Sequence, residues 1–231
     1  MIKRLMRSVF SRRGAISGRQ GGKVQASRAS SVDPGVQDVE LYWDPKMAEL
    51  LETWGTDTVW KEIQLLMVNC SGGVLDIACG TGKTMEILSA CPVDVYGCDL
   101  SDLLISKAVE RGIEQDRLIV CDATSMPYEN DSFDYAYSIG SLEHFTSDGI
   151  SAFVKECYRV TRKTSYHMLP VSRSMKNEGW LKTYQSFYNN STDWWVKRFK
   201  ESYPSVYVLD STWSDAISIG KWFVCMKDEA N

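Results

Sequence analysis

The hydrophobic positions of the chain form short β-branched runs that alternate with longer segments of helical spacing. Five short runs predict strands: Val74–Ile77, Val93–Cys98, Leu118–Cys121, Asp131–Ser138 and Thr164–Val171. Three stretches between them predict helices: Lys83–Cys91, Asp102–Arg111 and Ile150–Val160. Alternating strands and helices are typical of a parallel sheet that is covered on both faces. The pattern therefore predicts an α/β domain.

The segments on either side of this region are less regular. Two helices are predicted before it: Val39–Trp54, which contains the helix-start pair Asp44-Pro45, and Thr58–Val68. After it, Ser172–Asn190 is polar with interspersed aromatic residues, as in a loop that contributes to a pocket. A helix and two last strands are predicted beyond that loop: Ser191–Tyr203, Val206–Leu209 and Lys221–Met226.

The first predicted strand runs directly into a glycine turn, Cys79-Gly80-Thr81-Gly82, which precedes a helix. A strand, a glycine turn and a helix together hold a nucleotide-like cofactor at the carboxyl edge of a parallel sheet. A phosphate-binding P-loop would need glycine where Ile77 stands, and a dinucleotide site would need a third glycine where Met85 stands. Both of these cofactor classes are therefore disfavoured.

The run Leu75–Gly82 resembles the first motif of class I S-adenosylmethionine-dependent methyltransferases of the small-molecule type, similar to methyltransferase domain 11. That family usually has glycine where this chain has Ala78. Three further motifs follow in the family's order: Asp99 after the second strand, Asp122-Ala123 after the third, and Ser138–Phe145 at the end of the fourth. The resemblance extends from about residue 42 to about residue 170, and it implies S-adenosylmethionine as the cofactor.

The resemblance also implies roles for the motif residues. Gly80 and Gly82 would let the backbone lie against the methionine part of the cofactor, and Asp76 would orient that loop and the cofactor amino group. Asp99 would accept hydrogen bonds from the ribose hydroxyls, while Asp122 would accept one from the adenine amino group. The full set of predicted cofactor-binding residues is Asp76, Ala78, Gly80, Gly82, Asp99, Leu100, Asp122, Ala123 and Ser138. The alternative is that each aspartate is an ordinary turn or cap residue.

The fold implied by the resemblance is a single Rossmann-like, doubly wound domain. It would contain a seven-stranded, mostly parallel sheet that ends in a C-terminal antiparallel hairpin. The predicted domain is 36–231, and it is preceded by a basic arm and flexible linker at 1–35.

The methyl acceptor would lie beside the segment that follows the fourth strand. His144 is the candidate general base, because the family places this segment next to the transferable methyl group and a histidine pKa suits the role. Glu143 would orient His144 or help to bind the substrate, and Tyr42 and Trp43 would line a lid over the site. The alternatives are a structural histidine bonded to backbone, a solvated carboxylate and aromatic residues of the core. The other histidine, His167, lies inside a strand and is expected to be buried and hydrogen-bonded.

The seven cysteines show no metal-type pairing, and no metal site is predicted. Cys79, Cys98 and Cys121 lie at or next to strand ends, which suits small buried side chains in a reducing compartment. A reactive thiol at Cys79 is the alternative.

Charge is distributed unevenly along the chain. Residues 1–30 contain eight Lys or Arg and no acidic residue, so the remaining 201 residues contain 18 basic and 30 acidic side chains, a net charge of −12. An acidic body is a poor surface for a phosphate backbone, and no nucleic-acid substrate is expected, although the arm could bind one weakly. Within the arm, residues 1–13 form a basic amphipathic pattern that fits peripheral membrane contact, a mitochondrial transit peptide or a tail without function.

The sequence thus predicts a methyltransferase that acts on a small molecule, with a hydroxyl of a sugar or of a glycolipid or polysaccharide precursor as the first choice. A quinone or other lipid-like ring is the alternative acceptor, and a non-catalytic cofactor-binding or scaffold protein is the alternative of another class. The expected location is the cytoplasm, at the inner face of a membrane, or else the mitochondrial matrix. The acceptor, the methylated atom and the oligomeric state are left open.

Overall fold

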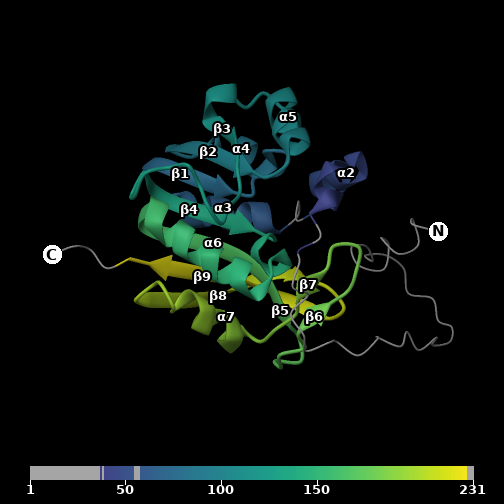
Figure 1. Cartoon of the computed structure of the whole chain (residues 1–231). Helices are drawn as coiled ribbons and strands as arrows, with labels where there is room; N and C mark the ends of the chain where they lie inside the picture. The colour runs from purple at the N-terminus through teal and green to yellow at the C-terminus, as the bar shows by residue number, and fades with distance from the viewer. Residues whose placement is uncertain (1–36, 38, 55–57, 228–231) are drawn as a thin grey trace.

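The computed structural model describes residues 37, 39–54 and 58–227, and its core is one seven-stranded sheet (Figure 1). The strands of this sheet are β1 (Gly72–Ile77), β2 (Val93–Asp99), β3 (Leu118–Val120), β4 (Phe133–Ile139), β5 (Thr161–Ser172), β8 (Ser205–Ser214) and β9 (Ser218–Met226). Their order is β3-β2-β1-β4-β5-β9-β8. The first five are parallel, whereas β9 is antiparallel to both of its neighbours. The predicted fold class, including the antiparallel hairpin at the end, is confirmed.

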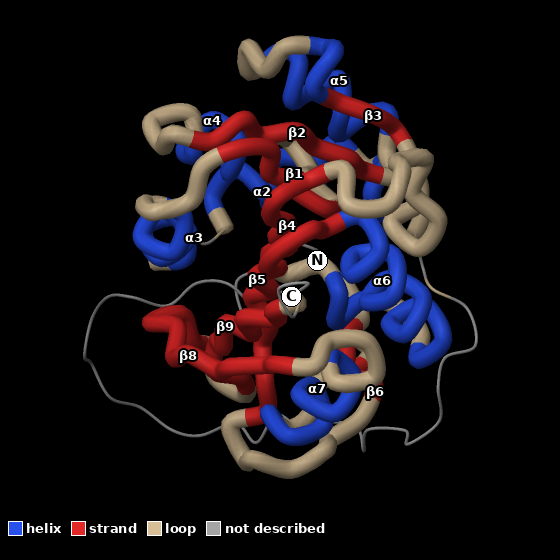
Figure 2. The backbone as a smooth tube through the Cα atoms, turned by 90° about the vertical axis from the view of Figure 1, so that its left-hand side faces the viewer, coloured by secondary structure: helices blue, strands red, loops and turns tan. Residues whose placement is uncertain are grey.

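Helices cover both faces of the sheet, and each face has its own apolar core. On one face pack α3 (Val59–Met67), α4 (Lys83–Leu88) and α5 (Asp102–Glu110), and on the other pack α6 (Ser147–Val160) and α7 (Thr192–Phe199). Figure 2 shows the strands as a layer between α3 and α4 on one side and α6 on the other. A parallel sheet of this kind buries both of its faces, which is why its strands read as nearly continuous apolar runs.

The N-terminal segment differs from its prediction as a single helix. It forms a 3₁₀ turn, η1 (Glu40–Trp43), and then the helix α2 (Pro45–Thr53). Asp44 separates the two, because it is extended and its Oδ1 accepts a hydrogen bond from the backbone N–H of Lys46 at 2.9 Å, as an N-cap does.

The polar loop after β5 also contains regular structure that the sequence does not predict. Its strands β6 (Trp180–Leu181) and β7 (Phe187–Tyr188) pair in a separate antiparallel hairpin. A short 3₁₀ turn, η3 (Leu142–His144), follows β4 and packs against β7, and a second, η2 (Gln115–Arg117), precedes β3. The hairpin therefore lies next to the region where the fourth strand ends.

Within the described part of the chain, no helix combines the length and the apolar character needed to span a membrane. The basic arm and linker predicted for 1–35, and the predicted domain start at 36, lie outside the described residues.

Candidate active site

A cavity of about 440 Å³ opens at the carboxyl ends of β1, β2, β3 and β4. This edge of an open α/β sheet, where the strand order reverses, is the general position of ligand sites in such folds. The strand order places residues that follow β3 at one end of the cavity and residues that follow β4 at the other. Seven of the nine predicted cofactor-binding residues line it: Asp76, Ala78, Gly80, Asp99, Leu100, Asp122 and Ala123.

The glycine turn takes left-handed backbone conformations at three positions. The φ angles are +59° at Ala78, +55° at Gly80 and +70° at Gly82. Glycine adopts the left-handed conformation of Gly80 freely, and a Cβ there would lie 3.2 Å from Cδ1 of Leu51, where α2 packs onto the turn. Ala78 is the strained member of the three, which fits the glycine that the resembled family usually has at this position.

Two buried carboxyl groups lie beside the turn, and Asp99 bonds to its backbone. The backbone N–H groups of Gly80 and Ser101 donate to Oδ2 and Oδ1 of Asp99, each at 2.9 Å. Burial raises the pKa of Asp99, and these backbone donors oppose the rise. Asp76 accepts a hydrogen bond from the Tyr137 hydroxyl at 2.8 Å, and burial holds the pKa of Asp76 well above its usual range. At the far end of the cavity, Asp122 accepts from the backbone N–H and the hydroxyl of Thr124, both at 2.8 Å.

Three predicted site residues do not line the cavity. The Gly82 backbone packs against Ala108, and its role is therefore to let α5 approach the turn. Ser138 is fully buried and bonds to Nδ1 of His167 at 2.9 Å. Trp43 turns away and donates from Nε1 to Asp102 at 2.9 Å, whereas its neighbour Tyr42 does line the cavity. None of the three therefore reaches the cavity, so the structure adds no support for a cofactor role of Gly82 and Ser138 or for a lid role of Trp43.

Glu143 and His144 are also outside the set of lining residues, although both are buried. Nδ1 of His144 lies 2.8 Å from the carbonyl oxygen of Ser186, and its Nε2 lies 3.6 Å from Oε1 of Glu143. Burial lowers the pKa of His144 to about 4 and raises the pKa of Glu143 to about 8. The pair is therefore neutral near pH 6. The base role of His144 stays a prediction, and the contact with Ser186 favours the alternative of a structural histidine that holds the β6–β7 hairpin.

Glu143→Gln is expected to make unfolding less dependent on pH. The folded pKa of Glu143, about 8, exceeds the usual value of 4.5, so in the wild type this group lowers the free energy of unfolding as pH rises from 4.5 through 8. The glutamine side chain does not titrate, so the variant does not lose this free energy of unfolding. The difference in free energy of unfolding between variant and wild type should therefore grow with pH by up to about 5 kcal/mol. Urea unfolding at pH 5, 7 and 9 measures the difference. The exposed Glu129→Gln serves as control and should follow the wild type; a Glu143→Gln profile parallel to the wild type would contradict a buried neutral carboxyl.

The cavity also has lining residues that were not among the predicted site residues: Leu51, Trp54, Ile139, Gly140, Ser141, Phe145 and Gln185. Those from 139 to 145 lie in the segment predicted to lie beside the methyl group, and Gln185 lies in the predicted pocket loop. Trp54 lies against the turn after β4, because a Cβ on Gly140 would be 3.0 Å from its ring. Nε2 of Gln185 donates to the Tyr42 hydroxyl at 3.4 Å, which joins the hairpin to η1. Aromatic residues on a helix that precedes the glycine turn were the available signal for Trp54, whereas the loop pattern does not single out Gln185.

The remaining predictions concern His167, Cys79 and the lack of a metal site. Both ring nitrogens of His167 are bonded, to Ser138 and at 2.9 Å to Ser165, as expected for a buried histidine. Cys79 lines the cavity, but burial raises its thiol pKa well above the usual range, which disfavours a reactive thiolate there. Within the described residues no group of three or more His, Cys, Asp or Glu is arranged to hold a metal; the absence of a metal stays a prediction.

Comparison with known proteins identifies the domain. Residues 74–164 match the model of a family described as a methyltransferase domain. Among solved structures, the fold is similar to an S-adenosylmethionine-dependent methyltransferase from Clostridium acetobutylicum (TM-score 0.61, 15% identity, 80% of this chain and 98% of that chain). It is also similar to phosphoethanolamine N-methyltransferase 2 from Haemonchus contortus in complex with S-adenosyl-L-methionine (TM-score 0.59, 16% identity, 76% and 53%). Over residues 74–164 the chain thus resembles a methyltransferase domain, on a fold shared with S-adenosylmethionine-dependent methyltransferases, and the predicted enzyme class and cofactor are confirmed.

Curated relatives extend the comparison to substrates. The Mus musculus protein named "Probable tRNA methyltransferase 9B" is 35% identical over 135 residues, which are 56% of this chain and 29% of that protein. The tRNA (carboxymethyluridine(34)-5-O)-methyltransferase of Arabidopsis thaliana is 28% identical over 115 residues, 48% of this chain and 27% of that protein. The 27-O-demethylrifamycin SV methyltransferase of Amycolatopsis mediterranei is 30% identical over 109 residues, 45% and 40%. The chain therefore spans less than half the length of each of these relatives.

The tRNA methyltransferases among these relatives correct one prediction. The acidic composition of residues 31–231 led to the expectation that no nucleic acid is involved, and that expectation is wrong. Overall composition does not report which surface meets a substrate, and a nucleotide can enter a cavity while the phosphate backbone meets another part of the protein.

The cavity fits the confirmed cofactor. The turn at Gly80 offers backbone without a Cβ, Asp99 offers carboxylate oxygens at the tip of β2, and Asp122 lies with Ala123 at the end farthest from β4. These residues would hold the methionine, ribose and adenine parts respectively. Such an arrangement leaves the region between β4, η1, α2 and the hairpin for the methyl acceptor.

Proposed function

We propose that the protein is an S-adenosylmethionine-dependent O-methyltransferase whose acceptor is a carboxylate carried by a modified tRNA nucleotide. The observation that carries the proposal is the chemistry of the acceptor end of the cavity, defined by Tyr42, Trp54, Ser141, Phe145 and Gln185. These side chains are aromatic or neutral and polar. Three aromatic rings suit a stacked nucleobase, and the Gln185 amide suits its polar edge.

These five described side chains carry no charge, which supports an acceptor oxygen that needs no base. A hydroxyl acceptor benefits from a base, whereas a carboxylate is already ionised at neutral pH. The cofactor supplies an activated sulfonium methyl group, so its transfer to a carboxylate oxygen gives a methyl ester and S-adenosylhomocysteine. The protein's contribution is to orient the acceptor and to exclude water, and orientation alone can supply a large part of the rate. Relatives named for 5-O-methylation of carboxymethyluridine support this choice.

The basic arm would supply the charge that tRNA binding needs. Residues 1–30 carry eight basic side chains and no acidic one, while the rest of the chain has a net charge of −12. Contacts from such a segment to phosphates would make tRNA binding weaken steeply with salt.

A transfer assay with radiolabelled S-adenosylmethionine tests the proposal. The acceptor is a tRNA with carboxymethyluridine at position 34, and the matched control is the same tRNA with unmodified uridine there. We expect label in the modified tRNA alone, and mild alkali should release it, because a methyl ester is hydrolysed and a methyl ether is not. Equal labelling of both tRNAs, or alkali-stable label, would refute the carboxylate acceptor.

A small-molecule hydroxyl is the second candidate acceptor, in a sugar, a glycolipid or polysaccharide precursor, or a lipid-like ring. Relatives that include 27-O-demethylrifamycin SV methyltransferase and O-methyltransferase rstn1 favour it. Alkali-stable label in a panel of hydroxyl compounds, with none in tRNA, would select this candidate.

A further inference from the structure

The lid of the cavity, which we define as η1, α2 and Trp54 (residues 40–54), is held to the domain by polar contacts and by the packing of Trp54 against Trp60 and Trp213. Figure 1 shows α2 beside α5, at the margin of the molecule. Of the nine residues of α2, Met47 and Ala48 are buried. The Ser101 hydroxyl donates to the carbonyl oxygen of Tyr42 at 2.8 Å, and Trp43 bonds to Asp102. A helix with so little buried apolar surface is a segment of low local stability.

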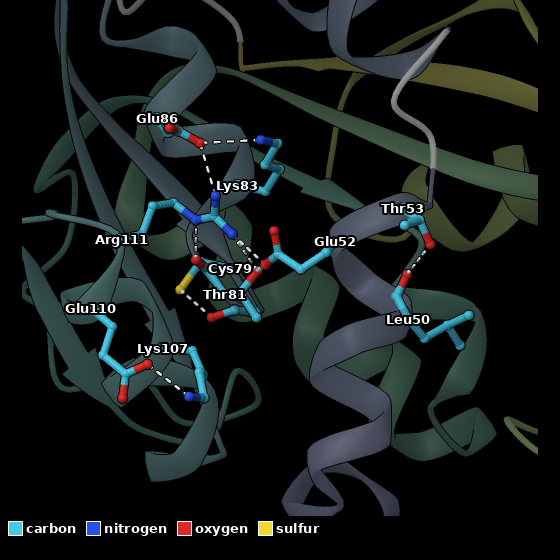
Figure 3. A network of polar contacts seen from close by, with 11 residues as sticks. Leu50, Glu52, Thr53, Cys79, Thr81, Lys83, Glu86, Lys107, Glu110 and Arg111 are labelled. Carbon is cyan, nitrogen blue, oxygen red and sulfur yellow. Dashed lines mark hydrogen bonds and ion pairs between the residues drawn. The ribbon is translucent and has the colours of Figure 1, made fainter.

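The described part of the lid has its strongest electrostatic contact at Glu52. Its Oε1 accepts hydrogen bonds from the Thr81 hydroxyl at 2.7 Å and from Nη2 of Arg111 (Figure 3). Arg111 also donates from Nε to the carbonyl oxygen of Thr81 at 2.8 Å and from Nη1 to Glu86 at 2.9 Å. Thr81 lies in the glycine turn, Glu86 lies in α4, and Arg111 follows α5. The guanidinium therefore ties the lid to the turn that would hold the cofactor.

The charges at this contact are well matched. The Arg111 side chain is 14% exposed and the Glu52 side chain 39%. Partial burial opposes ionisation of Glu52, but the hydrogen bonds from Arg111 and Thr81 outweigh it and lower the Glu52 pKa. Glu52 is thus a charged partner at neutral pH, and the ion pair is partly shielded from solvent.

The position of the pair links it to cofactor exchange. Leu51 and Trp54, on either side of Glu52, line the cavity and pack onto Gly80 and Gly140. S-adenosylhomocysteine would leave past the cavity wall that they form, and lid opening of this kind often limits turnover.

We propose that the Glu52–Arg111 ion pair is the latch of the lid and sets the rate at which the lid opens for cofactor exchange. The inference rests on the proposed function, because it requires the cavity to hold an S-adenosyl compound. Glu52 and Arg111 are positioning residues in this proposal: they act on the wall of the cavity, and Arg111 acts also through Thr81.

The test is the dissociation rate of S-adenosylhomocysteine from the whole chain, followed by the change in total tryptophan fluorescence in a stopped-flow experiment. Glu52→Ala should raise the dissociation rate about fivefold, the effect of losing a partly exposed ion pair. Glu52→Gln, which keeps the oxygen acceptor, should give a smaller increase. Adding Glu52→Ala to Arg111→Met should cause a smaller acceleration than Glu52→Ala causes in the wild type, because only the hydrogen bond from Thr81 to Glu52 is then left to lose.

Glu110→Ala is the matched control, because Glu110 pairs with Lys107 at 2.7 Å on the same helix and does not reach the lid (Figure 3). It should leave the dissociation rate unchanged, and the Tm of both alanine variants should be similar. An unchanged rate in Glu52→Ala would overturn the latch while leaving the proposed function intact. Failure of the wild type to bind S-adenosylhomocysteine would instead overturn the proposed function, and the latch with it.

Discussion

Asp99→Ala is expected to weaken S-adenosylmethionine binding about 100-fold. Hydrogen bonds to a charged group contribute about 1.5–3 kcal/mol each, and loss of the ribose contacts would therefore cost about 3 kcal/mol. The same substitution removes the acceptor of the Gly80 N–H at 2.9 Å, so the glycine turn would also lose its support. Calorimetric titration of wild type and variant measures the change in dissociation constant.

Asp94→Ala is the control for this prediction. Asp94 lies at the opposite end of β2 with its side chain 69% exposed, and its partner is Arg117 at 3.9 Å. The affinity of the Asp94→Ala variant for S-adenosylmethionine should match that of the wild type. An Asp99→Ala variant that is folded, as judged by circular dichroism, and binds within threefold of the wild type would remove Asp99 from the cofactor site.

Gly82→Ala is expected to lower the free energy of unfolding by about 3 kcal/mol. A residue with a Cβ at φ +70° costs about 1–2 kcal/mol, and the added methyl would lie 2.9 Å from Cβ of Ala108 and 3.2 Å from Cγ1 of Ile113. Overpacking of this kind adds about 1–3 kcal/mol. Urea unfolding monitored by tryptophan fluorescence gives the difference, with any change in slope reported alongside the midpoint.

A double-mutant cycle separates the two causes of this loss. Ala108→Gly makes room for the new methyl, so the double variant should be more stable than the sum of the single effects predicts. Strictly additive effects would mean that backbone strain alone accounts for the loss, and that α5 does not pack onto the turn as described.

The sheet and the cofactor end of the site could be predicted from the sequence because their signals are local. The glycine turn directly follows β1, and Asp99 and Asp122 come at or just after the ends of β2 and β3. In a parallel sheet such ends meet at one edge, so a pattern read along the chain becomes a cluster in space. Two residues predicted to bind the cofactor do not line the cavity at this end. Strand alternation turns Ser138 towards His167, and packing places Gly82 against α5.

The acceptor end could not be predicted in the same way, because it is assembled from segments far apart in the chain. Gln185 reaches Tyr42 across 143 positions, and His144 reaches Ser186 across 42. Within the 3₁₀ turn η1, Tyr42 lines the cavity and Trp43 does not. The resemblance to the family suggested His144 as a base. In the structure this side chain bonds to the hairpin, and no periodicity in the sequence reveals such a tertiary contact.

The central claim is that the cavity beside the glycine turn binds S-adenosylmethionine. The most direct test is calorimetric titration of the whole chain with S-adenosylmethionine and S-adenosylhomocysteine, with NADH and ATP as controls, followed by thermal unfolding at saturating ligand. We predict binding of the two S-adenosyl compounds alone, and at 100 times the dissociation constant a stabilisation of about 2.7 kcal/mol. Binding of NADH or ATP in their place, or of none of the four, would contradict the account.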